Sequence, residues 1–236
     1  MDIASFLADA MPFILPGMKM TFGTMLGLLV NGLGLTLAIF VVTLVGAIPL
    51  GVVVALCRMS KFKPLAVLAR FFISILRGTP LMLQLMAWMF APYYLFHISL
   101  DSNWKYIACG IGFILNYSAY FAEIYRSGIQ SIPRGQYEAA QVLGYSGMQT
   151  FMHIILPQVF KRIMPAMGNE VIALVKDTSL AFVLGCMEMF TQAKAIAASD
   201  VSMAPYLIAA LIYWCFTLLV EFVLGRIEKK MSYYHD

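Results

Sequence analysis

Residues 33–57 read LGLTLAIFVVTLVGAIPLGVVVALC, a run of apolar, small and hydroxyl side chains that contains no charged residue. A transmembrane α-helix needs about 20 mostly apolar residues, because the hydrocarbon core of a bilayer is about 30 Å thick. Further segments reach that length at residues 71–96, 106–128, 158–190 and 206–225. The sequence therefore predicts an all-α integral membrane protein with about five transmembrane helices.

The composition of the whole chain also indicates membrane embedding. Of the 236 residues, 61% are hydrophobic and 12% are charged, against roughly 45–50% and about 25% in soluble domains. The net charge of +4 is spread over loops without an aromatic-interleaved basic patch, so we expect no nucleic-acid partner. The four cysteines lack metal-ligand spacing, so we interpret them as small core residues and expect no metal site.

Basic residues are distributed unequally between the two sides of the predicted bundle. One side receives eleven Lys and Arg residues and the other receives three. Because positively charged loops stay in the cytoplasm, this difference predicts an external N-terminus and a cytoplasmic C-terminus. Residues 1–17 contain no basic residue, so we expect this stretch to be retained as a short interfacial helix rather than cleaved as a signal peptide. We predict one transmembrane domain, 1–236.

The longest predicted cytoplasmic loop spans residues 129–157. Pro133 breaks the preceding helix, and the stretch QYEAAQVLG then offers good helix formers up to Gly144, a C-terminal cap. Ser146 and Gln149 have the spacing of a capping box, which predicts the start of a second short helix. The loop is therefore predicted to be a helix-turn-helix beneath the membrane.

The first helix of this loop has a face that suits docking. Ala139, Ala140 and Leu143 are expected to share that face, and the two alanines would permit close approach by another surface. Glu138 lies in the first turn, where a carboxylate suits the helix dipole. From these residues alone, an amphipathic loop without a partner is an equal alternative.

The same loop carries a pattern that resembles a motif of a known family. It matches every fixed position of the EAA motif, E-A-A-x3-G-x9-I-x-L-P, found in permease subunits of ATP-binding-cassette (ABC) importers. Residues 76–85, 119–140 and 156–180 are similar to the polar amino-acid branch of that family, and the likeness extends from about residue 20 to 228. The matching residues are Glu138, Ala139, Ala140, Gly144, Ile154, Leu156 and Pro157.

The resemblance implies a type I ABC importer-like fold in a bacterial plasma (inner) membrane. It implies four kinds of partner: an ABC ATPase dimer, a second permease subunit that is identical or homologous, an external substrate-binding protein, and a polar amino acid as substrate. The EAA loop of that family is the coupling helix that docks on the ATPase, which assigns coupling to Glu138, Ala139, Ala140 and Gly144.

Energy would come from the partner, because this chain has no G-x-x-x-x-G-K-[ST] phosphate-binding loop. We therefore expect ATP and Mg to be bound by the ATPase, and no cofactor or catalytic residue in this chain. The alternative function is an ATP-independent channel or an ion-coupled amino-acid transporter, which would need no coupling helix.

Polar and charged residues within the predicted spans are the candidates for substrate binding, because such residues are costly in a bilayer. In the RGTP stretch, 77–80, Thr79 and Pro80 are predicted to be the N-cap and first residue of a new helix. Arg77 would then lie beside a helix N-terminus, where a carboxylate can bind. Anchoring of Arg77 at the cytoplasmic interface is the alternative. Gln84 is predicted either to line a pathway or to bridge helices by hydrogen bonds.

The segment 158–190 is too long for one straight span, since it would reach about 50 Å as an α-helix. A break at Asp177 would shorten the span. Thr178 or Ser179 would then cap a second half-helix, as in the broken helices that form midplane sites in transporters.

Charged residues in this segment complete the predicted site. Glu170 and Asp177 share a helical face, while Lys176 is rotated by about 100° from Asp177. Together with Arg77, the four charges sum to zero and offer both signs to a zwitterionic amino acid. An internal salt-bridge network without a ligand is the alternative.

Overall fold

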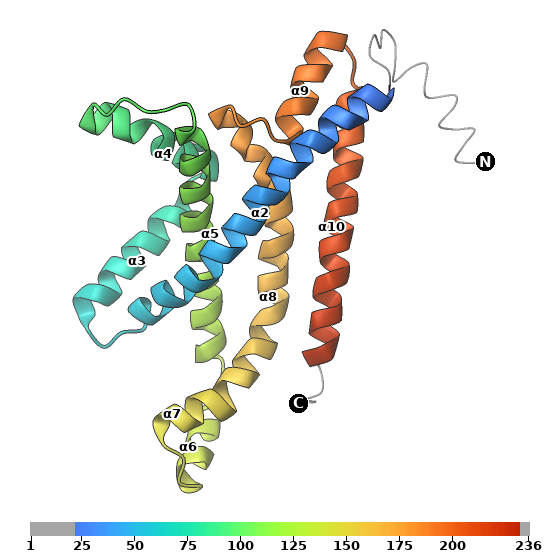
Figure 1. Cartoon of the computed structure of the whole chain (residues 1–236). Helices are drawn as coiled ribbons and strands as arrows, with labels where there is room; N and C mark the ends of the chain where they lie inside the picture. The colour runs from blue at the N-terminus through green and yellow to red at the C-terminus, as the bar shows by residue number, and fades with distance from the viewer. Residues whose placement is uncertain (1–21, 232–236) are drawn as a thin grey trace, which may run out of the picture.

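Figure 1 shows the computed structural model, which describes residues 22–231 as a bundle of helices. The interfacial helix predicted at residues 1–17 lies outside the described residues. The α-helices are α2 (Phe22–Arg58), α3 (Lys63–Gly78), α4 (Leu81–Phe96), α5 (Trp104–Gln130), α6 (Arg134–Val142), α7 (Gly147–Thr150), α8 (Leu156–Asp177), α9 (Met189–Asp200) and α10 (Ala204–Met231). A π-helical turn, η1 (Phe151–Ile155), joins α7 to α8, and a 3-10 helix, η2 (Thr178–Leu184), extends α8.

Three helices within the described range, α2, α5 and α10, are long and apolar enough to cross a membrane. The pair α3 and α4 also meets this condition, but the two helices are bent by 110° at the break between them. The predicted segment 71–96 therefore contains two helices, and the second begins at Leu81, directly after the Pro80 at which the sequence predicts a new helix. Pro80 has no N–H group with which to continue the helical hydrogen bonds, so α3 ends before it. The all-helical membrane architecture is confirmed.

The segment 158–190 changes its helix type where the sequence predicts a break. The α-helix ends at Asp177, the chain continues as η2, and Gly185 then ends it with a φ of 68°. The predicted capping is wrong, because the hydroxyls of Thr178 and Ser179 donate to carbonyls three residues earlier, at 2.7 Å in both cases. Neither hydroxyl accepts a backbone N–H, so the narrower helix runs on without a cap.

The central helix of the bundle is α5, which is buried along much of its length and packs against α2, α4 and α8. Glycine permits the close approach of α5 to α2 and of α5 to α8. A Cβ on Gly51 of α2 would lie 2.8 Å from the Phe121 Cβ of α5, and a Cβ on Gly128 of α5 would collide with Ile163 of α8. Residues without a Cβ at these positions therefore set the distance between α5 and its neighbours.

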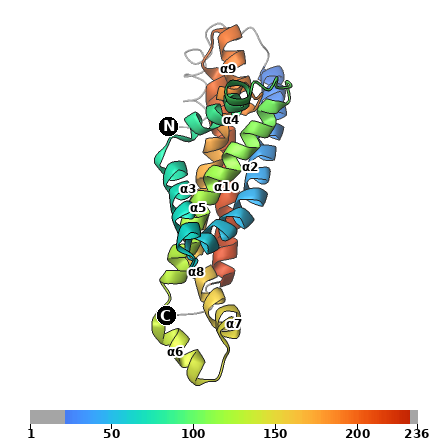
Figure 2. The same cartoon turned by 90° about the vertical axis from the view of Figure 1, so that its left-hand side faces the viewer.

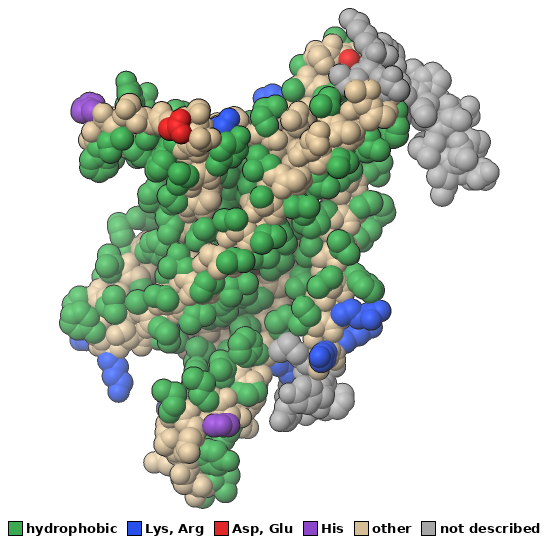
Figure 3. All heavy atoms as spheres, in the orientation of Figure 1, with side chains coloured by type: hydrophobic (Ala, Val, Ile, Leu, Met, Phe, Trp, Pro, Cys, Tyr) green, Lys and Arg blue, Asp and Glu red, His purple; other side chains and the backbone are tan. Residues whose placement is uncertain are grey.

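The outer surface agrees with a position in a bilayer. Hydrophobic side chains cover most of the face in Figure 3. A cluster of Lys and Arg lies near the end of α10, and a smaller basic patch lies at the turn between α2 and α3. Helices α6 and α7 project beyond the bundle at that same end (Figures 1 and 2). The fold thus separates an apolar bundle from a projecting helix-turn-helix loop.

Candidate functional site

A cavity of about 240 Å³ lies where the break between α3 and α4 faces α5 and the last turns of α8. It contains three of the residues predicted from the sequence to bind substrate, namely Thr79, Glu170 and Asp177. The full lining consists of Thr79, Leu81, Asn116, Tyr117, Tyr120, Glu170, Ala173 and Asp177. The cavity therefore joins three stretches of sequence, and the first and last of them are about 90 residues apart.

Two carboxylates reach the cavity from α8. Glu170 and Asp177 are seven residues apart, which is about two helical turns, so their side chains lie on the same face. The hydroxyl of Tyr117 on α5 donates to Oδ2 of Asp177 at 2.7 Å. Among the described residues, the other carboxylate oxygen of Asp177 accepts no hydrogen bond, so it remains available to a donor in the cavity.

Arg77 lies at the rim of the cavity rather than in its wall. Its guanidinium carbon is 5.1 Å from the centre of the Tyr120 ring, and Tyr120 lines the cavity. The positive charge of Arg77 acts on Glu170 electrostatically. Within residues 22–231, however, no ion pair joins Arg77 to a carboxylate. The predicted four-charge salt-bridge network is therefore not formed in this chain.

Lys176 does not line the cavity, and its side chain is exposed. The ion pairs found in the described part of the chain all involve Glu123, so Lys176 does not neutralise Asp177 or Glu170. Its rotation of about 100° from Asp177 along the helix explains why the two adjacent charges diverge. The role of Lys176 in substrate binding stays a prediction.

Thr79 lines the cavity in a different role from the predicted one. Its hydroxyl donates to the carbonyl of Ile75 at 2.8 Å, and Pro80 rather than Thr79 precedes α4 without a side-chain cap. The predicted N-cap is therefore wrong. Gln84 is buried behind the cavity wall and bridges helices by hydrogen bonds to Thr79 and Asn116.

Sequence reasoning missed Tyr117 and Tyr120, which contribute two aromatic rings to the cavity. They lie on α5 at a spacing of three residues, and such residues share a helical face. A pair of tyrosines on one face of a membrane helix was the available signal, because a buried hydroxyl needs a hydrogen-bond partner.

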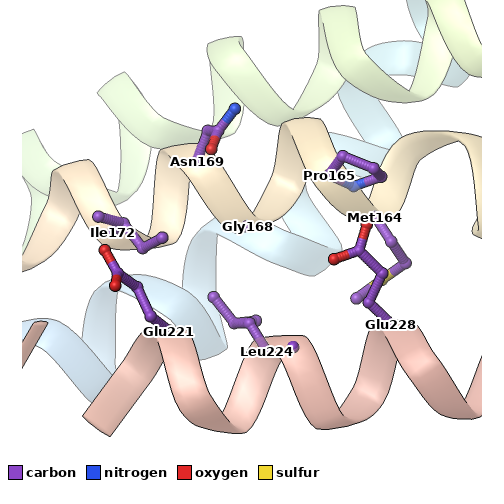
Figure 4. Close-up of a pocket in the computed structure, with 9 residues that line it drawn as sticks. Met164, Pro165, Gly168, Asn169, Ile172, Glu221, Leu224 and Glu228 are labelled. Carbon is purple, nitrogen blue, oxygen red and sulfur yellow. The ribbon is translucent and has the colours of Figure 1, made fainter. Parts of the chain in front are cut away.

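A second cavity, of about 190 Å³, lies between α8 and α10. Figure 4 shows Glu221 and Glu228 rising from α10 toward the α8 residues Ile172 and Pro165. Both glutamates are exposed, and none of the predicted substrate-binding residues lines this cavity. Substitutions in this second cavity can therefore be used as controls for substitutions in the first.

The loop between α5 and α8 folds as a helix-turn-helix, as predicted. Gly144 has a φ of 79°, a left-handed conformation that glycine adopts without steric cost. The Tyr145 N–H donates to the carbonyl of Ala140 at 3.0 Å, and the Gly144 N–H donates to that of Gln141 at 3.0 Å. These two bonds form a Schellman motif that ends α6 at the predicted glycine.

The second helix begins as predicted. Ser146 and Gln149 form the capping box with reciprocal hydrogen bonds of 3.4 Å and 2.9 Å. The predicted common face of α6 is only partly present, because Ala139 and Leu143 are exposed while Ala140 is buried within the loop. Adjacent residues differ by about 100° around a helix, which separates the two alanines.

The tip of the loop exposes a group of large apolar side chains, of which sequence reasoning singled out only Leu143. Val142 is 87% exposed, Leu143 is 73% exposed and Met148 is 68% exposed. They lie at the end of the loop that projects from the bundle (Figure 1). We call Val142, Leu143 and Met148 the apolar tip.

A helical membrane bundle with a polar cavity and a projecting helix-turn-helix defines a membrane transport subunit. Residues 47–233 match the family described as "Binding-protein-dependent transport system inner membrane component". The chain therefore belongs to this family of ABC transporter permease subunits, whose members are not themselves catalytic.

Individual relatives agree with this assignment. The chain is 38% identical over 205 residues to the arginine transport system permease protein ArtQ of Bacillus subtilis (strain 168), which covers 86% of this chain and 92% of that one. It is 35% identical over 212 residues to the L-cystine transport system permease protein TcyB of the same organism, with 88% of each chain covered.

Solved structures share the fold. A structure described as "Crystal structure of an amino acid ABC transporter with histidines" matches with a TM-score of 0.80 and 33% identity, over 90% of this chain and 100% of the other. The inward-facing MetNI methionine ABC transporter matches with a TM-score of 0.71 at 18% identity, again over 90% of this chain and 100% of the other. The second likeness shows the fold alone.

Proposed function

We propose that this chain is the permease subunit of an ATP-driven importer of polar amino acids. The observation that carries the proposal is the presence, in one chain, of a polar cavity inside the bundle and an apolar tip on the projecting loop. The cavity can hold a substrate, and the tip can transmit the motion of another subunit. The amino-acid substrates named for the bacterial relatives support the same substrate class.

In this proposal, the carboxylates of Glu170 and Asp177 bind the ammonium group of the amino acid. Charge-assisted hydrogen bonds are the strong ones, and they are stronger still away from water. Arg77 lies near enough to the cavity to bind the substrate carboxylate. Thr79 would add a hydroxyl, while Thr178 and Ser179 support the turn of chain after Asp177.

Lys176 supplies a test of the predicted site. We expect Lys176→Met to leave assembly intact, because no carboxylate in the described chain depends on Lys176 for neutralisation. Lowered uptake by the assembled variant would support the predicted role of Lys176 in substrate binding. The measurement is uptake into vesicles together with the amount of assembled transporter after purification. Failed assembly of the variant would favour a structural salt bridge with another subunit.

Coupling is proposed to run through the projecting loop. The apolar tip would enter a groove on an ABC ATPase that binds ATP and Mg, and Glu138, Ala139, Ala140 and Gly144 would shape the helix that carries it. Exposure of Val142 to water is unfavourable, and burial of a Val or Leu side chain contributes roughly 1.5–3 kcal/mol. The ATPase dimer, a second permease, identical or homologous, and an external substrate-binding protein complete the proposed assembly.

The proposed orientation in a bacterial plasma membrane follows the basic residues. The α2–α3 turn and the end of α10 lie toward the end of the bundle from which the loop projects, and both carry Lys and Arg side chains (Figure 3). Positively charged loops stay in the cytoplasm. We therefore place the loop and the C-terminus inside and the N-terminus outside, so that the tip faces a cytoplasmic ATPase.

The proposal is tested by measuring ATP hydrolysis by the assembled transporter across a panel of amino acids, each supplied with the substrate-binding protein. We expect a subset of polar amino acids to stimulate hydrolysis and apolar ones to have no effect. No stimulation by any amino acid of the panel would contradict the proposed function.

A further inference from the structure

The break between α3 and α4 leaves a backbone carbonyl without its helical donor. The carbonyl of Leu76 would normally accept from the residue four positions later, which is Pro80 and has no N–H. Leu76 is buried, and a buried carbonyl needs another partner. Side chains supply it, because Nε2 of Gln84 donates to Leu76 O at 2.9 Å and Nδ2 of Asn116 donates to the same oxygen at 3.0 Å.

Gln84 also holds the residue before the proline. Its Nε2 lies 3.0 Å from the Thr79 carbonyl and 2.9 Å from the Thr79 hydroxyl oxygen. The Thr79 hydroxyl in turn donates to the carbonyl of Ile75 at 2.8 Å. One side chain from α4 thus binds the end of α3 and holds the bend between the two helices. We call this bend, at Thr79 and Pro80, the α3–α4 elbow.

The orientation of both amide groups follows from this pairing. A carbonyl oxygen can only accept, so the amide nitrogens of Gln84 and Asn116 must both face Leu76 O. The Oε1 atom of Gln84 then accepts the second hydrogen of Asn116 Nδ2, at 3.0 Å. Both amide hydrogens of Asn116 are used, and its Oδ1 has no hydrogen-bond partner in the described part of the chain. Asn116 lines the cavity, so this oxygen is available to a donor there.

We propose that Gln84 is a positioning residue of the substrate cavity, which fixes the α3–α4 elbow and orients Asn116 so that its Oδ1 accepts from the substrate ammonium. The inference rests on the proposed function. Gln84 itself does not line the cavity and acts through Thr79 and Asn116, each of which belongs to the wall. This positioning role replaces the expectation that Gln84 contacts the substrate directly.

The test uses Gln84→Met in the complete transporter reconstituted in vesicles. Met fills a similar volume but cannot donate, so we expect assembly to persist and the KM for amino-acid uptake to rise about tenfold, the size of one charge-assisted hydrogen bond. The matched control is Thr43→Val, which removes a buried hydrogen bond of 2.7 Å to Ile39 O away from the cavity and should leave KM unchanged.

A double-mutant cycle with Asn116→Ala shows whether Gln84 acts on KM through Asn116 or independently of it. If Gln84 acts through Asn116, Gln84→Met should raise KM much less in the Asn116→Ala background than in the wild type. Equal increases in the two backgrounds would overturn the proposal. A general loss of folding would instead lower the amount of assembled transporter in every variant.

A distance measurement distinguishes failure of this inference from failure of the proposed function. Spin labels at Val67 on α3 and Phe90 on α4, both exposed, report the elbow without transport. We expect Gln84→Met to broaden their distance distribution and Thr43→Val to leave it unchanged. If the wild type imports amino acids but Gln84→Met changes neither KM nor the distances, the positioning role is wrong. A wild type that imports no amino acid contradicts the proposed function instead.

Discussion

Replacing Asp177 by Asn is expected to reduce the affinity for the transported amino acid by about tenfold or more, since hydrogen bonds to charged groups contribute roughly 1.5–3 kcal/mol. Asn keeps an oxygen that can accept from the Tyr117 hydroxyl, now 2.7 Å from Asp177. The local structure should therefore persist while the negative charge that faces the substrate ammonium is lost. The measurement is KM for uptake by the reconstituted transporter.

The second cavity provides the control for this variant. Glu221 lines the cavity between α8 and α10, and Glu221→Gln removes a carboxylate of the same kind from a membrane helix. We expect this substitution to leave KM unchanged. If Glu221→Gln raised KM strongly and Asp177→Asn did not, the substrate would bind in the α8–α10 cavity. That result would contradict the site proposed here.

A charge placed on the apolar tip is expected to abolish coupling. Leu143 is 73% exposed in the isolated chain, and in the proposed assembly it is buried against the ATPase. Burying an unpaired carboxylate costs far more than burying a neutral polar group. Leu143→Asp should therefore reduce ATP-driven uptake at least about a hundredfold, which corresponds to about 2.7 kcal/mol, while membrane insertion and the helical bundle remain intact.

The conservative variant Leu143→Met is the matched control for the tip. Met keeps an apolar side chain of similar volume, and such exchanges usually cost less than about 1.5 kcal/mol. Uptake by this variant should stay close to that of the wild type. If Leu143→Asp and Leu143→Met transport equally well, the tip does not enter an interface and the coupling role is wrong.

Local signals in the sequence predicted the projecting loop closely. The end of α6 at Gly144 and the capping box of Ser146 and Gln149 depend on residues within a few positions of one another. Such short-range hydrogen bonds are determined by residue type and spacing. The exposure of Val142 could not be predicted, because burial of the neighbouring Ala140 depends on how α6 turns against the rest of the loop.

The cavity could be predicted only in part. The face shared by Glu170 and Asp177 follows from helical periodicity, and both line the cavity. Charge counting allowed Lys176 to neutralise them, but its rotation of about 100° from Asp177 leaves its side chain exposed and outside the cavity. Arg77 is likewise held over the Tyr120 ring, a contact between separate helices that sequence spacing does not reveal.

The elbow between α3 and α4 shows the same limit. Pro80 signalled a break, because it cannot donate to the helix. The 110° bend is instead held by Gln84, four residues later, and by Asn116 on α5. One of the two partners of the orphaned Leu76 carbonyl, Asn116, is 40 residues away in the sequence, so only the packed bundle identifies it.

The central claim is that this chain moves an amino acid only when a separate ATPase drives it. The most direct measurement is uptake of a labelled polar amino acid into vesicles that contain either the purified chain alone or the chain with its ATPase and substrate-binding protein. The account predicts no uptake by the chain alone, and ATP-dependent uptake by the full assembly. Uptake without ATP by the chain alone would contradict it and favour a channel or an ion-coupled transporter.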